Sequence, residues 1–139
     1  MVRRRDEERP TVLVVDADTV VRQLIAKALK HQGFRSLIAA TATECLEILR
    51  ENPHAISLVI TDIFMPKMSG LDLATELSRR YPHLKLLYIS GAHESIGMRG
   101  IASGCPEIVL RKPFTAEMLA ARVRQLCAGA GRNIALGPS

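Results

Sequence analysis

Five short apolar runs, each followed by an amphipathic segment, constrain the fold of this chain more than any other feature of its sequence. The runs are rich in Val, Ile and Leu, are apolar on both faces, and fall at residues 12–15, 36–40, 57–61, 84–89 and 107–110. Strands that alternate with helices form parallel sheets, because each parallel pair needs a long crossover that packs on one face of the sheet. We therefore predict an α/β fold of three layers, a doubly wound five-stranded parallel sheet with helices on both sides.

Polar residues and helix breakers define the ends of the predicted helices. The residues expected to cap the helix N-termini are Asp18, Thr41, Ser69 and Thr115. Glu44 stands three residues after Thr41, which is the spacing of a capping box. The residues expected to end helices are Gly33, Pro53 and the pair Tyr81-Pro82. A helix between the last two strands is predicted to be the weakest element, because Gly97, Gly100 and Gly104 within it each cost about 1 kcal/mol relative to Ala.

The length of 139 residues suits one domain, which we place at residues 11–128. Residues 1–10 are predicted to form a disordered basic tail and residues 129–139 a loose C-terminal tail. The net charge is +5, but four of the arginines lie in the first tail, before the predicted domain begins, and the chain has no Trp on which bases could stack. We therefore expect no direct binding of nucleic acid.

A membrane span, a disulfide framework and a zinc site find no support in the composition. No apolar run approaches the ~18 residues that span a bilayer, and the charged N-terminus lacks the apolar core of a signal peptide. We expect a soluble chain in the cytoplasm with no membrane contact. Cys45, Cys105 and Cys127 are odd in number and widely spaced, so they predict buried apolar side chains and not a disulfide framework or a zinc site.

Charged and hydroxyl side chains fall where four of the predicted strands end. Asp16 and Asp62 follow the first and third runs, Ser90 ends the fourth, and Lys112 closely follows the fifth. In the strand order 2-1-3-4-5, which we predict, the two aspartates flank the switch point at which parallel sheets bind ligands. Charges brought together out of water cost several kcal/mol unless they are paired, so these residues are poorly suited to a purely structural role. Their position therefore favours a functional site. The alternative is that the aspartates cap helices and pair with Lys112 in a salt bridge.

These residues resemble the receiver domain of response regulators. The segment LVITDIFMPKMSGLDL at residues 58–73 is close to the family's phosphoacceptor segment, and LLYISGA at 86–92 and LRKPF at 110–114 follow at the expected intervals. The resemblance covers about residues 11–128 and implies a flavodoxin-like fold. It also implies a histidine kinase or phosphotransfer protein as phosphoryl donor and a downstream protein as target.

The resemblance assigns a role to each residue at the strand ends. Asp62 would be phosphorylated, Ser90 would bond a phosphoryl oxygen, and Lys112 would pair with the phosphoryl group next to a cis peptide to Pro113. A cation and a hydroxyl on rigid strand ends suit the transfer of a phosphoryl group, because they stabilise its equatorial oxygens. Mg²⁺ would be held by Asp16, Asp62 and the Phe64 carbonyl. The receiver itself would not be an enzyme beyond its own phosphorylation and dephosphorylation.

Two positions depart from the family pattern. Ala17 stands where the second member of an acidic pair would bind Mg²⁺ directly, so we predict weak metal binding, with Asp18 capping the first helix and not replacing the missing ligand. Val109 stands where the family usually has an aromatic switch residue, which places the usual coupling to the outer face in question. Phe64 is expected to hinder the approach of water and to slow dephosphorylation.

Two other functions remain open from the sequence. A pseudo-receiver that binds proteins without phosphorylation is favoured by Ala17 and Val109. A phosphatase of the haloacid dehalogenase superfamily would use Asp16 as nucleophile and Asp18 as acid/base, but Glu117 is the only acid after Lys112 and lies on a predicted helix.

Surface features indicate where a partner could bind. We expect docking on the first helix through Val21 and Ile25, together with Pro113-Phe114, with a core position as the alternative for both helix residues. The segments around Ser90 and Lys112 resemble the terminal receivers of hybrid kinases, although a stand-alone regulator fits as well. The four histidines, expected at the surface, are His31, His54, His83 and His93.

Overall fold

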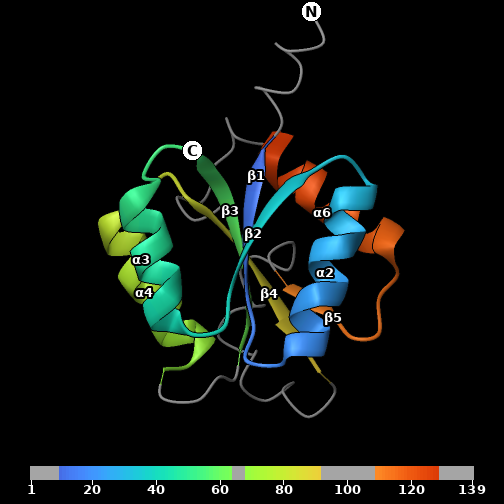
Figure 1. Cartoon of the computed structure of the whole chain (residues 1–139), viewed down its shortest axis with the longest axis horizontal. Coiled ribbons are helices and arrows are strands. Elements are labelled where there is room, and N and C mark those ends of the chain that lie inside the picture. Colours follow the sequence, from blue (N-terminus) through green and yellow to red (C-terminus); the bar gives the residue numbers. More distant parts are fainter. Residues whose placement is uncertain (1–9, 64–67, 92–108, 129–139) are drawn as a thin grey trace, which may run out of the picture.

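A computed structural model of the chain describes residues 10–63, 68–91 and 109–128. Five parallel strands form one sheet in the order β2-β1-β3-β4-β5, as predicted (Figure 1). The strands are β1 (Thr11–Val15), β2 (Arg35–Ala39), β3 (Ile56–Asp62), β4 (Lys85–Ser90) and β5 (Val109–Arg111). Because all strands run the same way, their carboxyl ends lie at one rim, the lower edge of the view in Figure 1.

Four described helices connect or follow the strands, and their caps are those that the sequence predicts. The helices are α2 (Thr19–His31), α3 (Ala42–Glu51), α4 (Gly70–Arg80) and α6 (Ala116–Ala128). The Thr41 hydroxyl accepts the Glu44 N–H at 3.1 Å, and the Glu44 carboxylate accepts the Ala40 N–H at 2.7 Å. Gly33 ends α2 with a φ of +93°, a left-handed conformation that side chains disfavour. Local sequence signals therefore set these helix ends.

Two apolar cores lie on opposite faces of the sheet. Alternate residues of the central strands face opposite ways, so Val12 and Val14 join one core while Leu13 and Val15 join the other. Helices α2 and α6 cover the first core, and α3 and α4 cover the second (Figure 1). The central strands are thus buried on both faces, and the sheet provides a rigid base for its rim.

The edge strand β2 corrects one expectation. The prediction that every strand is apolar and covered on both faces is wrong for β2, where Leu37 and Ile38 are 38% and 44% exposed. Strand β2 lies at the edge of the sheet and, among the described strands, pairs with β1 alone, so these side chains are less covered than those of the central strands. Cys45 is buried and Cys127 half-buried, in line with the expected apolar role of these cysteines.

Several predictions fall on residues that the structure does not describe. The weak helix with its three glycines, Cys105 and His93 lie outside the described residues, as do the two predicted tails except Pro10. His31, His54 and His83 are exposed, as expected. Within residues 10–63, 68–91 and 109–128, no helix is long and apolar enough to cross a bilayer.

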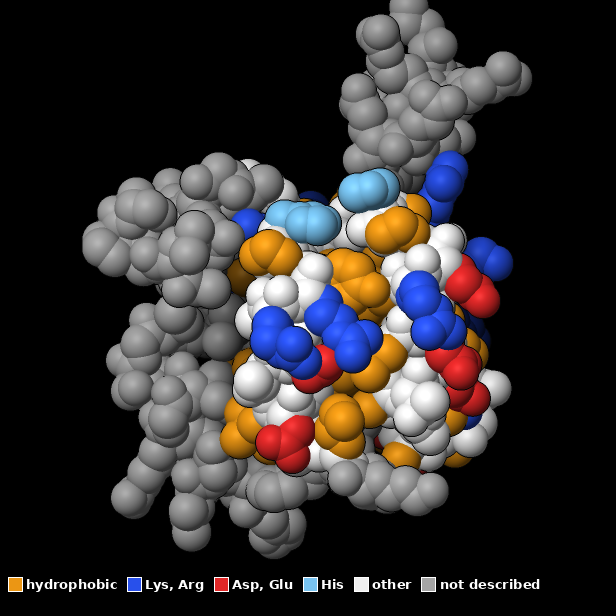
Figure 2. All heavy atoms as spheres, turned by 90° about the vertical axis from the view of Figure 1, so that its left-hand side faces the viewer, with side chains coloured by type: hydrophobic (Ala, Val, Ile, Leu, Met, Phe, Trp, Pro, Cys, Tyr) orange, Lys and Arg blue, Asp and Glu red, His pale blue; other side chains and the backbone are white. Residues whose placement is uncertain are grey.

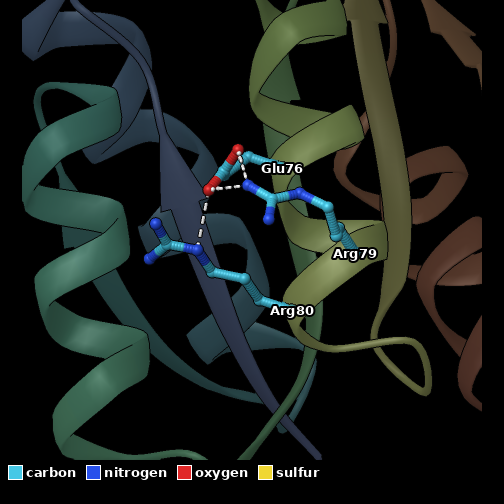
Figure 3. A network of polar contacts seen from close by, with 3 residues as sticks. All are labelled: Glu76, Arg79 and Arg80. Atoms are coloured by element: carbon cyan, nitrogen blue, oxygen red, sulfur yellow. Dashed lines mark hydrogen bonds and ion pairs between the residues drawn. The ribbon is translucent and has the colours of Figure 1, made fainter.

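The outer face of α4 carries a network of ion pairs. Glu76 Oε2 lies 2.7 Å from both Arg79 Nη2 and Arg80 Nε (Figure 3). The hydrogen bond from Arg79 is the main cause that lowers the pKa of the Glu76 carboxyl. Exposed pairs of this kind contribute little to stability. On the face of α3 and α4, Figure 2 accordingly shows acidic and basic side chains intermixed with apolar ones and no block of one sign.

Candidate functional site

The structure brings the four predicted polar residues to one rim of the sheet. Asp62 and Ser90 are the last residues of β3 and β4, while Asp16 and Lys112 directly follow β1 and β5. The Lys112 N–H donates to the Ser90 carbonyl oxygen at 2.8 Å, which ties the end of β5 to the end of β4. The charges of Asp62 and Lys112 both act on the Asp16 carboxyl, so these groups share one electrostatic environment. Tertiary structure thus assembles the constellation that the strand order predicts.

Asp16 is a buried carboxylate, with only 3% of its surface exposed. Burial raises the pKa of its carboxyl, and the nearby charge of Asp62 raises it further. A hydrogen bond from the Asp18 N–H, 2.8 Å from Asp16 Oδ1, and the charge of Lys112 lower the pKa in part. Ionisation of both Asp16 and Asp62 is disfavoured, because Lys112 offers one positive charge against two negative ones. Such a site favours the binding of a further cation.

Positions 17 and 18 decide how many acids strand β1 offers. Ala17 is exposed and has no oxygen in its side chain. The Asp18 carboxylate accepts the N–H groups of Val20 at 2.9 Å and Val21 at 3.4 Å, so it caps α2 as predicted. Because the carboxylate of Asp18 is engaged in this cap, Asp16 is the acid that β1 contributes to the rim.

Gly70 is a site residue that the sequence analysis did not single out. A Cβ at this position would overlap the carbonyl oxygen of Asp62 and would lie 3.0 Å from the Cα of Ile63. The Gly70 N–H donates to the Ile63 carbonyl oxygen at 2.6 Å, which binds the start of α4 to the end of β3. One sequence signal could have indicated this role: Gly70 stands at the first position of the predicted helix, where a glycine does not serve as the cap. Its absent side chain lets α4 approach the acceptor strand.

Ser90 places a buried hydroxyl beside the acceptor strand. The residue is fully buried, and among the described residues its Oγ is a buried side-chain atom without a hydrogen-bond partner. A buried hydroxyl without a partner costs roughly 1–3 kcal/mol, so its position calls for a ligand that would satisfy it. The Lys112-Pro113 peptide is cis, as the resemblance implies.

Val109 is buried and aliphatic at the predicted switch position. It is 7% exposed and lies opposite Tyr88 of β4, which is 5% exposed. Both side chains pack with Ile63 and with Ala74 of α4. Desolvation raises the pKa of the Tyr88 hydroxyl to about 12. Among the described residues of this cluster, the aromatic ring is that of Tyr88 on β4, two residues before Ser90, and β5 contributes an aliphatic side chain.

The predicted metal site includes one residue outside the described ranges. Phe64, whose carbonyl was predicted as a metal ligand and whose ring was predicted to hinder water, lies outside the described residues. Within the described ranges, no group of three or more His, Cys, Asp or Glu residues could hold a metal ion. The carboxylates of Asp16 and Asp62 are therefore the acidic oxygen ligands on which a cation at this rim would depend.

Comparison with known proteins identifies the family. A family model described as the response regulator receiver domain matches residues 12–124. The chain belongs to the response regulator receiver family. Receiver domains interact with histidine kinases and downstream effectors, typically use Mg²⁺ at the phosphorylation site, and are generally not enzymes.

Similar receivers occur within much longer proteins. The chain is 33% identical over 116 residues to the sensor kinase CckA of Brucella abortus (strain 2308) and 35% identical over 120 residues to an NtrX-like response regulator of Rickettsia bellii (strain RML369-C). Each match includes 84% of this chain, but only 12% and 24% of those proteins. The chain therefore spans a quarter or less of their length.

Solved structures agree with the fold. A response regulator receiver domain from Clostridium thermocellum superposes with a TM-score of 0.79 at 31% identity, covering 86% of this chain and 94% of that one. A CheY-like receiver from Methanospirillum hungatei JF-1, at 22% identity and a TM-score of 0.75, supports the same flavodoxin-like arrangement of five parallel strands.

Proposed function

We propose that Asp62 accepts a phosphoryl group and that the receiver signals this change through protein contacts. The observation that carries the proposal is the buried Ser90 hydroxyl, which has no hydrogen-bond partner in the described part of the chain. A phosphoryl oxygen on Asp62 would supply an acceptor for it. The neighbouring strand ends add the Lys112 ammonium, which is suited to a new negative charge at the same rim.

The chemistry follows from these positions. An oxygen of the Asp62 carboxylate attacks phosphorus in line with the leaving group, the P–N bond of a phosphohistidine breaks, and the imidazole nitrogen keeps the electron pair. Ser90 donates to one equatorial oxygen and Lys112 offsets the charge on the others. The product adds about −1.5 to −2 of charge at the carboxyl ends of the strands.

Magnesium fits this rim, although with few ligands. Burial, and after it the charge of Asp62, raises the pKa of the Asp16 carboxyl. Two carboxylates at one rim favour a hard cation with oxygen ligands, which Mg²⁺ is. Asp16 and Asp62 would hold it, together with the Phe64 carbonyl that the family resemblance implies. When bound, Mg²⁺ neutralises charge on the transferred group. Because Ala17 supplies no ligand, we propose that Mg²⁺ binds more weakly here than beside an acidic pair.

The proposed partners are a histidine kinase or phosphotransfer protein and a downstream protein target. The docking residues expected on the first helix are corrected by the structure, because Ile25 is buried in the core and Val21 is half-buried beside it. Val20 and Leu24 are instead 64% and 61% exposed, one turn apart on α2. We propose these two residues as the apolar contact. Because kinases take the phosphoryl group from ATP, we propose that the chain works in the cytoplasm. We propose neither direct binding of nucleic acid nor an enzymatic activity on a separate substrate.

Acetyl phosphate with Mg²⁺ tests the proposal, since it needs no cognate kinase. The intact mass of the wild-type protein should rise by one phosphoryl group, whereas Asp62→Asn should gain none. Ala17→Asp should reach the same labelling at a lower Mg²⁺ concentration. No mass gain in either the wild type or Ala17→Asp, across millimolar Mg²⁺, would refute phosphoryl transfer to Asp62.

The second candidate is a pseudo-receiver that binds proteins without phosphorylation. Ala17 and the aliphatic Val109 favour it, because one removes a metal ligand and the other a switch aromatic. It predicts that neither the wild type nor Ala17→Asp gains a phosphoryl group, although both proteins are folded. The phosphatase alternative depends on an acid after Lys112, and Glu117 is exposed on α6. Turnover of a chromogenic phosphate ester that Asp16→Asn abolishes and Asp62→Asn spares would favour that alternative.

A further inference from the structure

Arg22 reaches back from α2 to the end of strand β1. Its Nη1 donates to the carbonyl oxygen of Asp16 at 2.6 Å, and its Nη2 donates to Thr19 Oγ1 at 3.2 Å. The side chain is half-buried, although both lysines of the same helix, Lys27 and Lys30, are exposed. A guanidinium that bonds a backbone carbonyl at this distance makes a charge-assisted hydrogen bond, which is stronger than a neutral one.

The contact completes a set of bonds that fix Asp16 in place. The Asp16 N–H donates to the Ala39 carbonyl oxygen at 3.1 Å, and Asp16 Oδ1 accepts the Asp18 N–H at 2.8 Å. With the bond from Arg22, three of the four polar atoms of Asp16 are engaged. The fourth atom, Oδ2, belongs to the carboxyl on which the charges of Asp62 and Lys112 act at the rim.

This arrangement matters more here than it would beside an acidic pair. Ala17 has no carboxylate and the Asp18 carboxylate caps α2, so the β1 end offers Asp16 alone. If the peptide of Asp16 moves, no neighbouring acid can take its place. Site geometry has to be held to a fraction of an ångström to be productive, which requires supporting bonds of this kind.

We propose that Arg22 is a positioning residue: through the Asp16 carbonyl oxygen, it fixes the peptide that carries the single carboxylate of β1 at the acceptor rim. The inference deepens the proposed function, because it concerns the geometry of that same site. Arg22 acts on a backbone atom, so it need not touch the phosphoryl group.

Matched substitutions on α2 separate positioning from charge. Arg22→Gln removes the guanidinium, and Lys27→Gln removes the same charge from an exposed position of the same helix. Arg22→Lys keeps a charged donor and should restore part of the wild-type behaviour. Any effect of net charge on the rim should be similar in Arg22→Gln and Lys27→Gln, whereas loss of positioning should appear in Arg22→Gln alone.

Amide hydrogen exchange measures the geometry without phosphorylation. In Arg22→Gln, the Asp18 amide, which bonds Asp16 Oδ1, should exchange roughly tenfold faster than in the wild type, as expected when a charge-assisted bond that supports it is lost. The amide of Val59 in the central strand reports global unfolding and corrects for any loss of stability. Lys27→Gln should leave the Asp18 amide unchanged. Equal exchange of this amide in wild type and Arg22→Gln would overturn the proposal.

The Mg²⁺ dependence of labelling by acetyl phosphate gives the functional readout. Arg22→Gln should raise the half-saturating Mg²⁺ concentration roughly tenfold and leave the rate at saturation within about twofold. In an Asp16→Asn background, Arg22→Gln should add no further shift, because its effect passes through Asp16. An undiminished shift in that background would also overturn the proposal. If the wild type takes no phosphoryl group, the proposed function fails, and the exchange of the Asp18 amide still decides the role of Arg22.

Discussion

Replacing Gly70 by Ala should destabilise the domain, although the same change usually stabilises a helix. The added Cβ would overlap the Asp62 carbonyl oxygen and press on the Cα of Ile63 at 3.0 Å. Both contacts are backbone atoms, so no rotation of a side chain relieves them. Relief requires the start of α4 to move away, which weakens the 2.6 Å bond from the Gly70 N–H to the Ile63 carbonyl.

The magnitude follows from these opposing effects. Overpacking typically costs about 1–3 kcal/mol, and a weakened backbone hydrogen bond adds about 1 kcal/mol. Ala gains at most about 1 kcal/mol over Gly in a helix, and less at its first position. The expected net loss in the free energy of unfolding is therefore about 2 kcal/mol. With a urea m-value of about 1–3 kcal/mol/M, the unfolding midpoint should fall by roughly 1 M.

Urea unfolding monitored by circular dichroism measures this loss, with Gly91→Ala as the control. A Cβ at Gly91 would meet no atom of the described residues within 4 Å, and the φ of Gly91 is not in the left-handed range, so this substitution should change the midpoint little. If Gly70→Ala were as stable as Gly91→Ala, the close approach of α4 to the acceptor strand would be refuted. Labelling of the folded Gly70→Ala variant should also slow, because relief of the overlap displaces the end of β3.

Three further substitutions probe the rim and one helix cap. Burial raises the pKa of Asp16, so the folded state binds the Asp16 proton more tightly than the unfolded chain does, and stability is lost as pH rises from the ordinary pKa of 3.8 through the folded pKa. In Mg²⁺-free buffer, Asp16→Asn should therefore be more stable than the wild type at pH 7. Urea unfolding as a function of pH should show that this advantage is lost below pH 3.8. Ser90→Ala should leave the urea midpoint unchanged or raised, because it removes a buried hydroxyl that has no partner among the described residues. The same substitution should slow labelling by acetyl phosphate. A large loss of stability would contradict the assignment of that hydroxyl to a ligand. Thr41→Ala should cost about 1 kcal/mol in thermal unfolding through loss of the α3 cap, and no cost would mean that the cap is not formed.

Sequence reasoning succeeded where the signal was local. Asp18, Thr41 and Ser69 cap helices because a side-chain oxygen reaches an N–H two or three residues away, and that relation is written in the sequence. The rim was also predictable, because parallel strands place their carboxyl ends together whatever their side chains are. Asp16 and Asp62 therefore met as expected.

The features that sequence reasoning missed depend on the packing of separate elements. Only the docking of α4 on β3 shows that a side chain at Gly70 would overlap Asp62. Similarly, Arg22 could have extended into solvent, and the fold alone brings it to the carbonyl of Asp16. The exposed apolar pair on α2 was displaced by one position from the predicted one, because apolar residues stand next to each other at positions 20–21 and 24–25 and the sequence does not reveal which of each two faces the sheet.

The measurement that tests the account most directly is the location of the phosphoryl group after treatment with acetyl phosphate and Mg²⁺. The account predicts that the peptide containing Asp62 carries one phosphoryl group, which borohydride reduction marks at residue 62, and that Asp62→Asn carries none. A phosphoryl group that remains in Asp62→Asn, or one mapped to Asp16, would contradict it.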